Sequence, residues 1–146
     1  MKKISNILVP YDGSNCSKRA FKLALDMAQK FHSKLILVSC IEKLNGSWFG
    51  LELSPFYQKE VKKYQETIKK EITKLESESK KRKIPLTAKI FVTDSIVKQI
   101  LSFSKSQRID LIVMGSHGKT RLDKLILGSV ANGIVQKSKV PVLIVR

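Results

Sequence analysis

Three glycines and a serine stand at a spacing that suits phosphate binding. Residues 115–129 read GSHGKTRLDKLILGS, so Gly115, Gly118, Gly128 and Ser129 form the pattern G-x2-G-x9-G-S. Glycine permits positive φ and close approach of a ligand, and unpaired amides at the start of a following helix attract phosphate oxygens. The pattern therefore predicts a phosphate-binding loop with the Ser129 hydroxyl as a further donor. The alternative, that these glycines only turn the chain, stays open.

Better-known site motifs do not fit this chain. Gly118-Lys119-Thr120 has the ending of a P-loop, but Val113 stands where that motif needs its first glycine. The sequence contains no G-x-G-x-x-G, so a dinucleotide fingerprint has no support. The cysteines, Cys16 and Cys40, form no C-x-x-C or Cys/His spacing. We therefore predict free thiols and no metal site.

Asp12 and His117 are the candidate polar partners of the glycine loop. Asp12 follows the first predicted strand, which favours ligand contact, although it also suits a turn or a helix cap. His117 lies inside the loop, but no carboxylate is placed in the sequence to orient it as a base, so we interpret it as loop structure. The basic side chains nearby either neutralise phosphate charge or keep the segment soluble; they are Lys119, Arg121 and Lys124.

The elements that position these residues alternate between strands and helices. Continuous apolar runs predict strands buried on both faces, and apolar residues three and four apart predict amphipathic helices. The strands are expected at 7–10, 35–41, 86–92, 109–114 and 140–145, and the helices at about 21–31, 59–83, 96–103 and 130–135. An irregular insertion at about 43–58 follows the second strand.

This β-α-β-α-β-α-β-α-β order predicts an α/β fold. We expect a single domain over residues 1–146, built on an open, parallel, five-stranded sheet with right-handed crossovers and helices on both faces. Ligands of such sheets bind outside the carboxyl ends of the strands. Asp12 and the glycine loop both follow strands, so they are expected to face each other there.

The composition is that of a folded chain with a strong positive charge. Apolar residues make up 42% of the 146 residues, which suffices for one core. Apolar runs are far shorter than the roughly 20 residues a bilayer needs. The start of the chain lacks a secretory signal, which predicts a cytoplasmic location.

The chain carries a large excess of basic residues. Lys and Arg number 28 against 12 Asp and Glu, which gives a net charge of +16. This charge favours anionic partners but does not indicate which kind of anion binds.

The predicted helix 59–83 carries much of this charge, with ten Lys or Arg and five Glu. We interpret it as a solvated face rather than a nucleic-acid surface, because the acids are interspersed and Tyr64 is its one aromatic residue. The insertion before it is rich in aromatic and apolar residues. These pack on the domain, cover a ligand or contact another subunit; they are Trp48, Phe49, Leu51, Leu53, Phe56 and Tyr57.

Four segments of the chain resemble the universal stress protein family, in its ATP-binding branch. They are 7–14 (ILVPYDGS), 113–118 (VMGSHG), 127–129 (LGS) and 140–145 (VPVLIV), so the resemblance covers nearly the whole chain. It implies a Rossmann-like sheet of the adenine nucleotide alpha hydrolase-like kind. It also implies ATP binding, because branches that do not bind ATP generally lack the long glycine spacing.

The resemblance further implies which residues contact the nucleoside. Asp12 is expected against the ribose or adenine with Pro10 beside it, Cys40 against the adenine, and Met114 in support. Two positions depart from the family pattern. Cys40 stands where valine is common, although a small thiol fills a similar volume, and Thr93 stands where glycine is usual.

The resemblance implies a phosphate cradle and a mode of assembly as well. ATP, together with Mg²⁺, is the implied cofactor. The chain is expected to form a homodimer through its last strand, Val140–Val145, since an apolar edge strand is otherwise prone to aggregate. The phosphate cradle would consist of Gly115, Gly118, Gly128, Ser129 and Val130.

Three functions are compatible with these residues. The favoured one is a cytoplasmic stress-response protein that binds ATP as a regulatory ligand, without turnover, and acts on an unknown downstream protein. The second is a slow ATPase or phosphotransferase, although no obvious base accompanies the loop. The third is nucleic-acid binding by the basic surface, which predicts affinity that falls steeply with salt. We expect neither a membrane nor a nucleic-acid partner.

Overall fold

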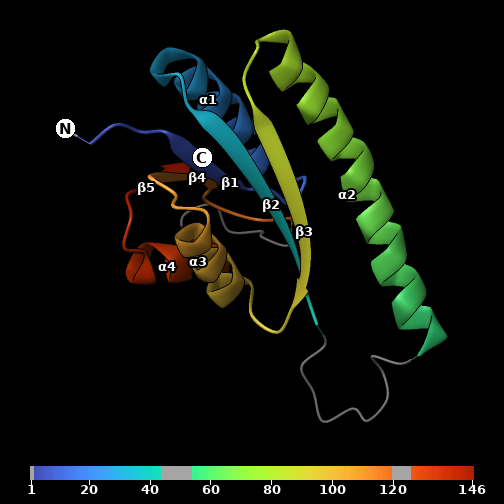
Figure 1. The fold of residues 1–146 in the computed structure, drawn as a ribbon. Helices are drawn as coiled ribbons and strands as arrows, with labels where there is room; N and C mark the ends of the chain where they lie inside the picture. Colours follow the sequence, from blue (N-terminus) through green and yellow to red (C-terminus); the bar gives the residue numbers. More distant parts are fainter. Residues whose placement is uncertain (1, 44–53, 120–125) are drawn as a thin grey trace.

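The computed structural model describes residues 2–43, 54–119 and 126–146. Within them a five-stranded sheet lies between two pairs of helices (Figure 1). None of the described helices is long and apolar enough to cross a membrane. In chain order the elements are β1 (Asn6–Pro10), α1 (Asn15–Phe31), β2 (Lys34–Glu42), α2 (Pro55–Lys81), β3 (Leu86–Thr93), α3 (Ile96–Ser106), β4 (Leu111–Gly115), α4 (Ser129–Lys137) and β5 (Val142–Val145).

The strand order β3-β2-β1-β4-β5 explains where a site can form. Every neighbouring pair is parallel, and Ile7 of β1 lies opposite Leu35 of β2 and Leu111 of β4. From β1 the chain continues to β2 on one side, whereas β4 occupies the other side. The carboxyl ends of β1 and β4 therefore border the crevice in which ligands of such sheets bind. The prediction of an open parallel α/β sheet is confirmed.

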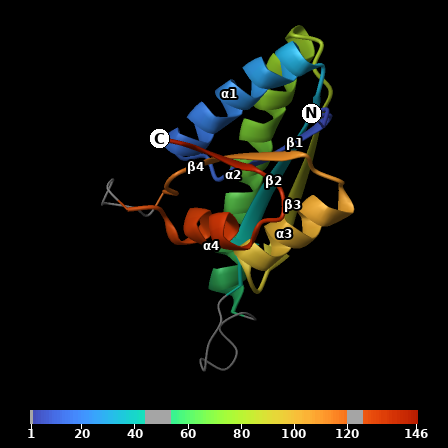
Figure 2. The ribbon, with the colours of Figure 1, turned by 90° about the vertical axis from the view of Figure 1, so that its left-hand side faces the viewer.

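Two apolar layers hold the helices to the sheet. Ile7 and Val9 of β1 face α1 and α2, whose buried residues include Phe21 and Ile68. Leu8 points to the other face, where it joins the cluster under α3 and α4. The second view shows the two helix pairs on opposite sides of the strands (Figure 2). Because both faces are covered, the inner strands are continuous apolar runs, as the sequence indicated.

Helix α2 begins earlier than its apolar spacing predicts. Its first residue is Pro55, four residues before the expected start at Lys59, so the end of the expected insertion is helical. The Ser54 side chain accepts a hydrogen bond from the Tyr57 amide, and proline suits the first helical turn because its missing N–H is not needed there. The predictions for Trp48, Phe49, Leu51 and Leu53 fall outside the described residues.

The last strand is shorter than expected. β5 comprises Val142–Val145, while Val140 and Pro141 precede it. The Ser138 hydroxyl bonds to the Val140 carbonyl, and the Pro141 carbonyl accepts the Ile112 amide, so this segment leads into the sheet as a turn. β4 likewise begins at Leu111 rather than Ile109, because the Ile109 amide still bonds back to Ser104 at the end of α3.

Candidate functional site

A cavity of about 600 Å³ opens at the carboxyl ends of β1, β2 and β4; we call it the glycine-loop cavity. It contains every residue that the sequence analysis assigned to ATP, although those residues come from four separate segments. Their role in binding stays a prediction, but their convergence on one cavity is a property of the fold. They are Pro10, Asp12, Cys40, Met114, Gly115, Gly118, Gly128, Ser129 and Val130.

Asp12 serves both of the roles that the sequence left open. Its Oδ1 accepts the Ser14 amide at 2.9 Å, which closes the turn before α1. Its Oδ2 lies directly beside Gly118: a Cβ added to Gly118 would be 2.8 Å from this oxygen. The carboxylate is therefore fixed by one oxygen and presents the other to the glycine loop.

The other two loop glycines are required by close backbone packing. A Cβ on Gly115 would lie 2.7 Å from Cys16 Cβ and 2.9 Å from the Cys16 carbonyl carbon, so this glycine lets the end of β4 approach the start of α1. A Cβ on Gly128 would lie 3.2 Å from the Ser116 carbonyl oxygen, to which the Gly128 amide donates at 2.8 Å. At Gly118 an added Cβ would instead meet a side chain, the Asp12 carboxylate.

The start of α4 differs from the other helix starts in the described chain. Serine side chains at positions 14, 54 and 95 accept an amide hydrogen bond at the beginning of α1, α2 and α3. At α4 the cap residue is Gly128, which makes no side-chain bond. The first residues of α4, Ser129, Val130 and Ala131, line the cavity, and no side chain caps their amides. Such amides attract phosphate oxygens, and the helix dipole adds to the attraction.

One wall of the cavity is apolar and suits a flat base. It includes Val38, Cys40 and Met114, with Ile96 and Ile100 from α3. Burial raises the pKa of the Cys40 thiol to about 11, so the side chain is a neutral thiol at pH 7. Cys40 therefore behaves as a small apolar residue here, as valine would.

Thr93 departs from the family pattern without distorting the backbone. It ends β3 with its carbonyl accepting the Lys43 amide at 2.8 Å. Its hydroxyl lies 3.3 Å from the Ser95 amide, which closes the turn into α3. It is not among the residues with positive φ, so glycine is not needed at this position.

Helix α2 contributes to the site in a way that the sequence analysis missed. The Tyr11 hydroxyl, at the end of β1, donates to Glu71 Oε2 at 2.7 Å, and Tyr64 lines the cavity. Burial and the Glu71 carboxylate raise the pKa of Tyr11, and burial together with the charges of Asp12 and Glu71 raises the pKa of Tyr64 to about 12. A signal was available: Glu71 interrupts the apolar stripe that includes Ile68 and Ile72.

Lys119 and His117 occupy different places in the glycine loop. The Lys119 ammonium lies 5.6 Å from the centre of the Tyr64 ring and lines the cavity mouth. His117 Nδ1 lies 2.8 Å from the Ser116 hydroxyl, and its Nε2 contacts the Ile126 carbonyl oxygen. Both ring nitrogens are thus engaged within the loop, in agreement with its interpretation as loop structure. Arg121 and Lys124 lie outside the described residues.

Comparison with known proteins agrees with this geometry. The model of the universal stress protein family matches residues 3–146. The chain belongs to that family. A universal stress protein of Thermus aquaticus is 30% identical over 140 residues, covering 96% of this chain and 97% of that protein. The solved universal stress protein UspA of Lactobacillus plantarum superimposes with a TM-score of 0.90 at 22% identity, and all of both chains is covered.

Two further structures of this fold contain adenine nucleotides. A universal stress protein in complex with cAMP has a TM-score of 0.69 at 22% identity and covers 99% of this chain and 98% of that one. A universal stress protein of Archaeoglobus fulgidus in complex with dAMP has a TM-score of 0.65 at 18% identity, with coverage of 99% and 100%. At these identities the likeness establishes the fold of this chain.

Proposed function

We propose that this universal stress protein binds ATP in the glycine-loop cavity as a regulatory ligand. The observation that carries the proposal is the start of α4, which has glycine in place of a capping side chain and whose first residues line the cavity. The other described helices cap their own first turn with serine. A helix start left open beside a glycine loop matches the needs of a bound phosphate.

The phosphate groups would be held mainly by the backbone. The amides of Ser129, Val130 and Ala131 would supply donors, the Ser129 hydroxyl would add one more, and the lack of a side chain at Gly118 would let the backbone approach the phosphates closely. The Lys119 ammonium at the mouth offsets part of the negative charge. Mg²⁺ usually keeps several waters and binds substrate phosphates plus one or two carboxylates, so Asp12 is its candidate ligand in this cavity.

The nucleoside would lie toward β2 and α3. The apolar wall around Cys40, Val38 and Met114 offers dispersion contacts to a planar base, while Asp12 and the main chain offer polar contacts to a sugar. The complexes of related proteins with cAMP and with dAMP support an adenine nucleotide as the ligand. The apolar wall itself does not distinguish between adenine nucleotides of different phosphate content.

We infer binding without turnover from the side chains that surround the loop. Hydrolysis needs a water oriented by a base and a group that stabilises the transferred phosphoryl. The His117 ring is engaged with Ser116 and Ile126 inside the loop, and Asp12 Oδ1 is committed to the Ser14 amide. These contacts hold the loop in shape and leave the phosphates bound rather than attacked. A nucleotide kept intact can report its own concentration to a partner protein.

We also propose a cytoplasmic homodimer that pairs through β5. This strand is the outer strand beside β4, and each of its residues is only partly buried. An apolar edge strand of this kind is stabilised when a second copy covers it. Sedimentation at micromolar concentration would give twice the 16.5 kDa chain mass if the proposal holds.

Calorimetric titration of nucleotide-free protein tests the proposed ligand. ATP with Mg²⁺ is titrated at moderate and at high salt, and UTP is the control for the base. Saturable binding of ATP, weaker binding of UTP and survival of both features at high salt would support the site. Equal binding of ATP and UTP, or complete loss at high salt, would mean that the charge of the surface rather than the shaped cavity attracts the nucleotide.

A further inference from the structure

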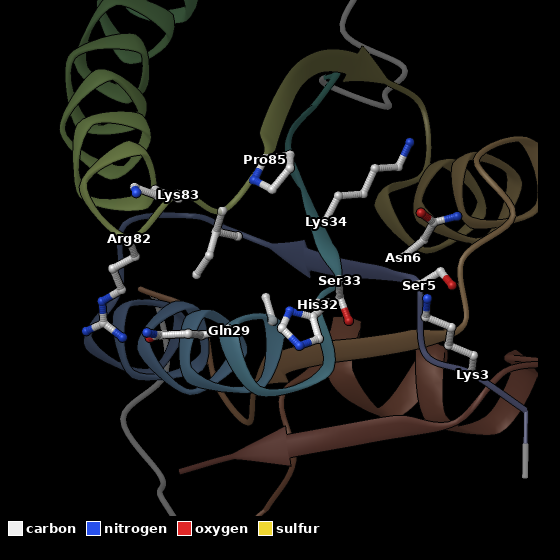
Figure 3. A pocket seen from close by; sticks show the side chains of 12 residues that line it. Lys3, Ser5, Asn6, Gln29, His32, Ser33, Lys34, Arg82, Lys83 and Pro85 are labelled. Carbon is white, nitrogen blue, oxygen red and sulfur yellow. The ribbon is translucent and has the colours of Figure 1, made fainter.

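A second cavity lies at the opposite end of the sheet, where β1 and β2 begin and where α1 and α2 end; we call it the basic cavity (Figure 3). It also measures about 600 Å³, and its buried floor includes Ala28, Ser33 and Ile84. Its lining contains no acidic side chain among the described residues. The basic side chains that line it are Lys3, His32, Lys34, Arg82 and Lys83.

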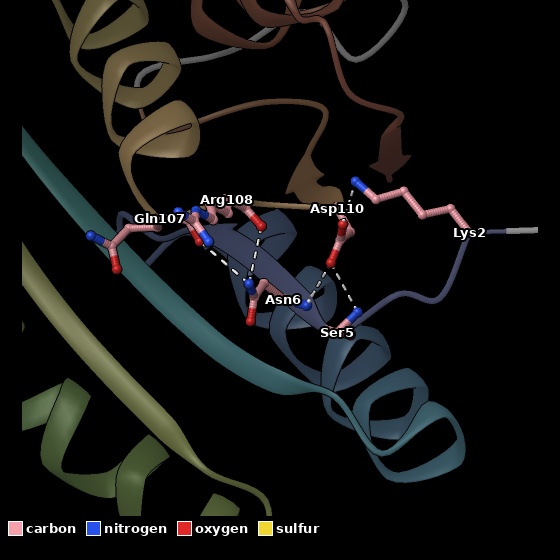
Figure 4. Close-up of polar contacts among 6 residues, drawn as sticks. All are labelled: Lys2, Ser5, Asn6, Gln107, Arg108 and Asp110. Atoms are coloured by element: carbon pink, nitrogen blue, oxygen red, sulfur yellow. Dashed lines mark hydrogen bonds and ion pairs between the residues drawn. The ribbon is translucent and has the colours of Figure 1, made fainter.

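These side chains come from three separate segments of the chain, which precede β1, connect α1 to β2 and follow α2. His32 and Lys34 flank the connection from α1 to β2, and Arg82 and Lys83 follow α2. Lys3 precedes β1 in a segment anchored by Asp110, which accepts the Ser5 amide at 2.9 Å and the Asn6 amide at 3.1 Å (Figure 4). The neighbouring Lys2 pairs with Asp110 at 2.9 Å. Lys3 is therefore held at the rim while the charge of Lys2 is neutralised.

Most of this positive charge makes no ion pair within the part of the chain that the structure describes. Arg82 is paired, because its Nη1 lies 2.6 Å from Asp26. Lys3, Lys34 and Lys83 make no ion pair with any residue that the structure describes. Three unpaired lysines thus contribute to the lining of one cavity. Their like charges repel one another, and a bound anion would relieve the repulsion.

Neutralisation of the helix ends does not account for this cluster. The C-terminal ends of α1 and α2 each carry about half a negative charge, so together they offset about one of the three ammonium charges. The last carbonyls are already bonded by backbone amides: Ala28 accepts from the amides of residues 32 and 33, and Ser79 from those of residues 82 and 84. A net charge of about +2 remains at the cavity.

Two of the basic residues occupy positions where glycine is the usual choice. His32, directly after α1, has φ of 55°, and Lys83, two residues after the end of α2, has φ of 57°; both lie in the left-handed region. Glycine adopts this conformation without the cost that a side chain incurs. Basic side chains are present at both positions even though glycine would complete the same turns with less strain.

We propose that the basic cavity binds a compact anion that carries two or more phosphate groups. The basic residues line a cavity instead of forming a long strip along the surface. A cavity fits a small ligand better than an extended nucleic acid. Lysine ammonium groups are suited to phosphate, and several negative charges are needed to balance three of them. The basic cavity is at the far end of the sheet from the glycine loop. The two cavities share no lining residue.

Inorganic tripolyphosphate is a suitable probe, because it has no base or sugar for the apolar wall of the other cavity. It is titrated into the full, isotope-labelled chain while backbone amides are followed by NMR. The amides of Ser33 and Ile84 report on the basic cavity, and those of Gly118 and Ser129 report on the glycine-loop cavity. The expected result is a saturable shift at Ser33 and Ile84, fitted separately from any shift in the glycine loop.

Charge-matched variants decide whether the cavity or the overall charge binds the probe. The triple variant K3Q/K34Q/K83Q removes three charges at the rim, and K62Q/K69Q/K74Q removes three exposed charges along α2. The first should weaken tripolyphosphate binding at Ser33 and Ile84 by about tenfold or more, because three contacts to one anion are lost. The second should change it about twofold at most, through long-range attraction alone.

Three outcomes would overturn the proposal. One is equal weakening by both triple variants, which would assign binding to the overall charge. Another is a shift confined to Gly118 and Ser129. The third is tighter binding of a single-stranded oligonucleotide that the rim variant abolishes, which would make this surface a nucleic-acid contact. A failure of the protein to bind ATP in calorimetry would not change the NMR shifts expected at Ser33 and Ile84. Failure of the proposed ATP site is therefore distinguishable from failure of the proposed anion site in the basic cavity.

Discussion

The two ends of the sheet attract anions by different physical means. At the carboxyl ends of the strands the donors are backbone amides and glycines, fixed in position by the fold. At the opposite end the cations are the long side chains of Lys3, Lys34 and Lys83, which are exposed. Fixed dipoles in a shaped cavity select a ligand by geometry, whereas flexible charges select it by charge number. The two proposals therefore place a specific site and a permissive one on a chain whose net charge is +16.

Substitution of Gly118 by valine should break the first site and spare the second. The added Cβ would lie 2.8 Å from Asp12 Oδ2, so the valine would displace this carboxylate and obstruct the approach of a phosphate to the loop backbone. We expect ATP affinity to fall by about 100-fold or more in calorimetry, as when several hydrogen bonds to a charged group are lost together. Tripolyphosphate binding at Ser33 and Ile84 is the internal control and should not change. Unaltered ATP affinity would contradict the proposed cradle.

Removal of the Asp110 carboxylate should destabilise the end of the sheet that carries the basic cavity. Its side chain is 9% exposed and accepts two amides besides pairing with Lys2. Asp110→Ala should cost about 2 kcal/mol in urea unfolding, because these partners lose their acceptor. Asp26→Ala is the control: Asp26 is 66% exposed and pairs only with Arg82, so the cost should stay below about 1 kcal/mol. Equal costs would rule out the anchoring role.

The same carboxylate gives the protein a defined response to acid. Burial alone would raise the pKa of Asp110, but the Lys2 ammonium and the amides of Ser5 and Asn6 lower it below its ordinary value. A carboxyl whose pKa is lower in the folded state stabilises the fold fully above its unfolded pKa, about 4, and loses that contribution as the pH falls further. Unfolding free energy should therefore decline less steeply below about pH 4 in Asp110→Ala than in the native chain.

A rise in salt should weaken binding at the basic cavity about three to five times more than binding at the glycine-loop cavity. Exposed ammonium groups are screened strongly, so a rise from moderate to high salt should weaken tripolyphosphate binding at the basic cavity by about tenfold. ATP in the glycine-loop cavity should lose only about two- to threefold, because short amide contacts and apolar burial are screened less. Parallel titrations at several salt concentrations measure both slopes. If the affinities at the two cavities fell equally with salt concentration, the proposed difference between fixed backbone donors and flexible lysine side chains would be wrong.

The smallest effect is expected at Cys40. Cys40→Val should change ATP affinity by about twofold at most, because the buried thiol already acts as a small apolar side chain. Cys40→Trp, in contrast, should abolish binding by filling the apolar wall with a much larger ring. Both variants are compared by calorimetry, with thermal unfolding as the check on the fold. A large loss in the valine variant would indicate that the thiol makes a specific contact with the nucleotide.

The sequence predicted the elements and the glycine-loop cavity well, because their signals are local. Apolar runs such as residues 35–41 mark a strand wherever they occur, and Gly128 and Ser129 stand at a fixed spacing from Gly118. Tyr64 was recognised as the one aromatic residue of the predicted helix 59–83 but was not assigned to the cavity. Its contribution depends on where α2 packs, and Glu71 was recognised as a partner of Tyr11 only in the folded chain.

The basic cavity illustrates what sequence reasoning cannot reach. Lys3, Lys34 and Lys83 are about 30 to 50 positions apart in the chain and form no motif. Net charge indicated an anionic partner but gave no location, since 28 basic residues are spread along the whole chain. Only the parallel sheet brings the starts of β1 and β2 beside the end of α2. The three lysines are brought to one cavity by the topology of the sheet, and no local sequence pattern indicates that they meet.

Helix α2 is long enough to act as a mechanical lever between the two ends of the molecule. Its 27 residues span about 40 Å at 1.5 Å per residue. Tyr64 lies on the glycine-loop cavity, Glu71 holds Tyr11, and the turn after the helix supplies Arg82 and Lys83 to the other cavity. A ligand that tilted this rod would move the binding groups of the other proposed site. Thermodynamic reciprocity would then require each ligand to change the affinity of the other by the same factor.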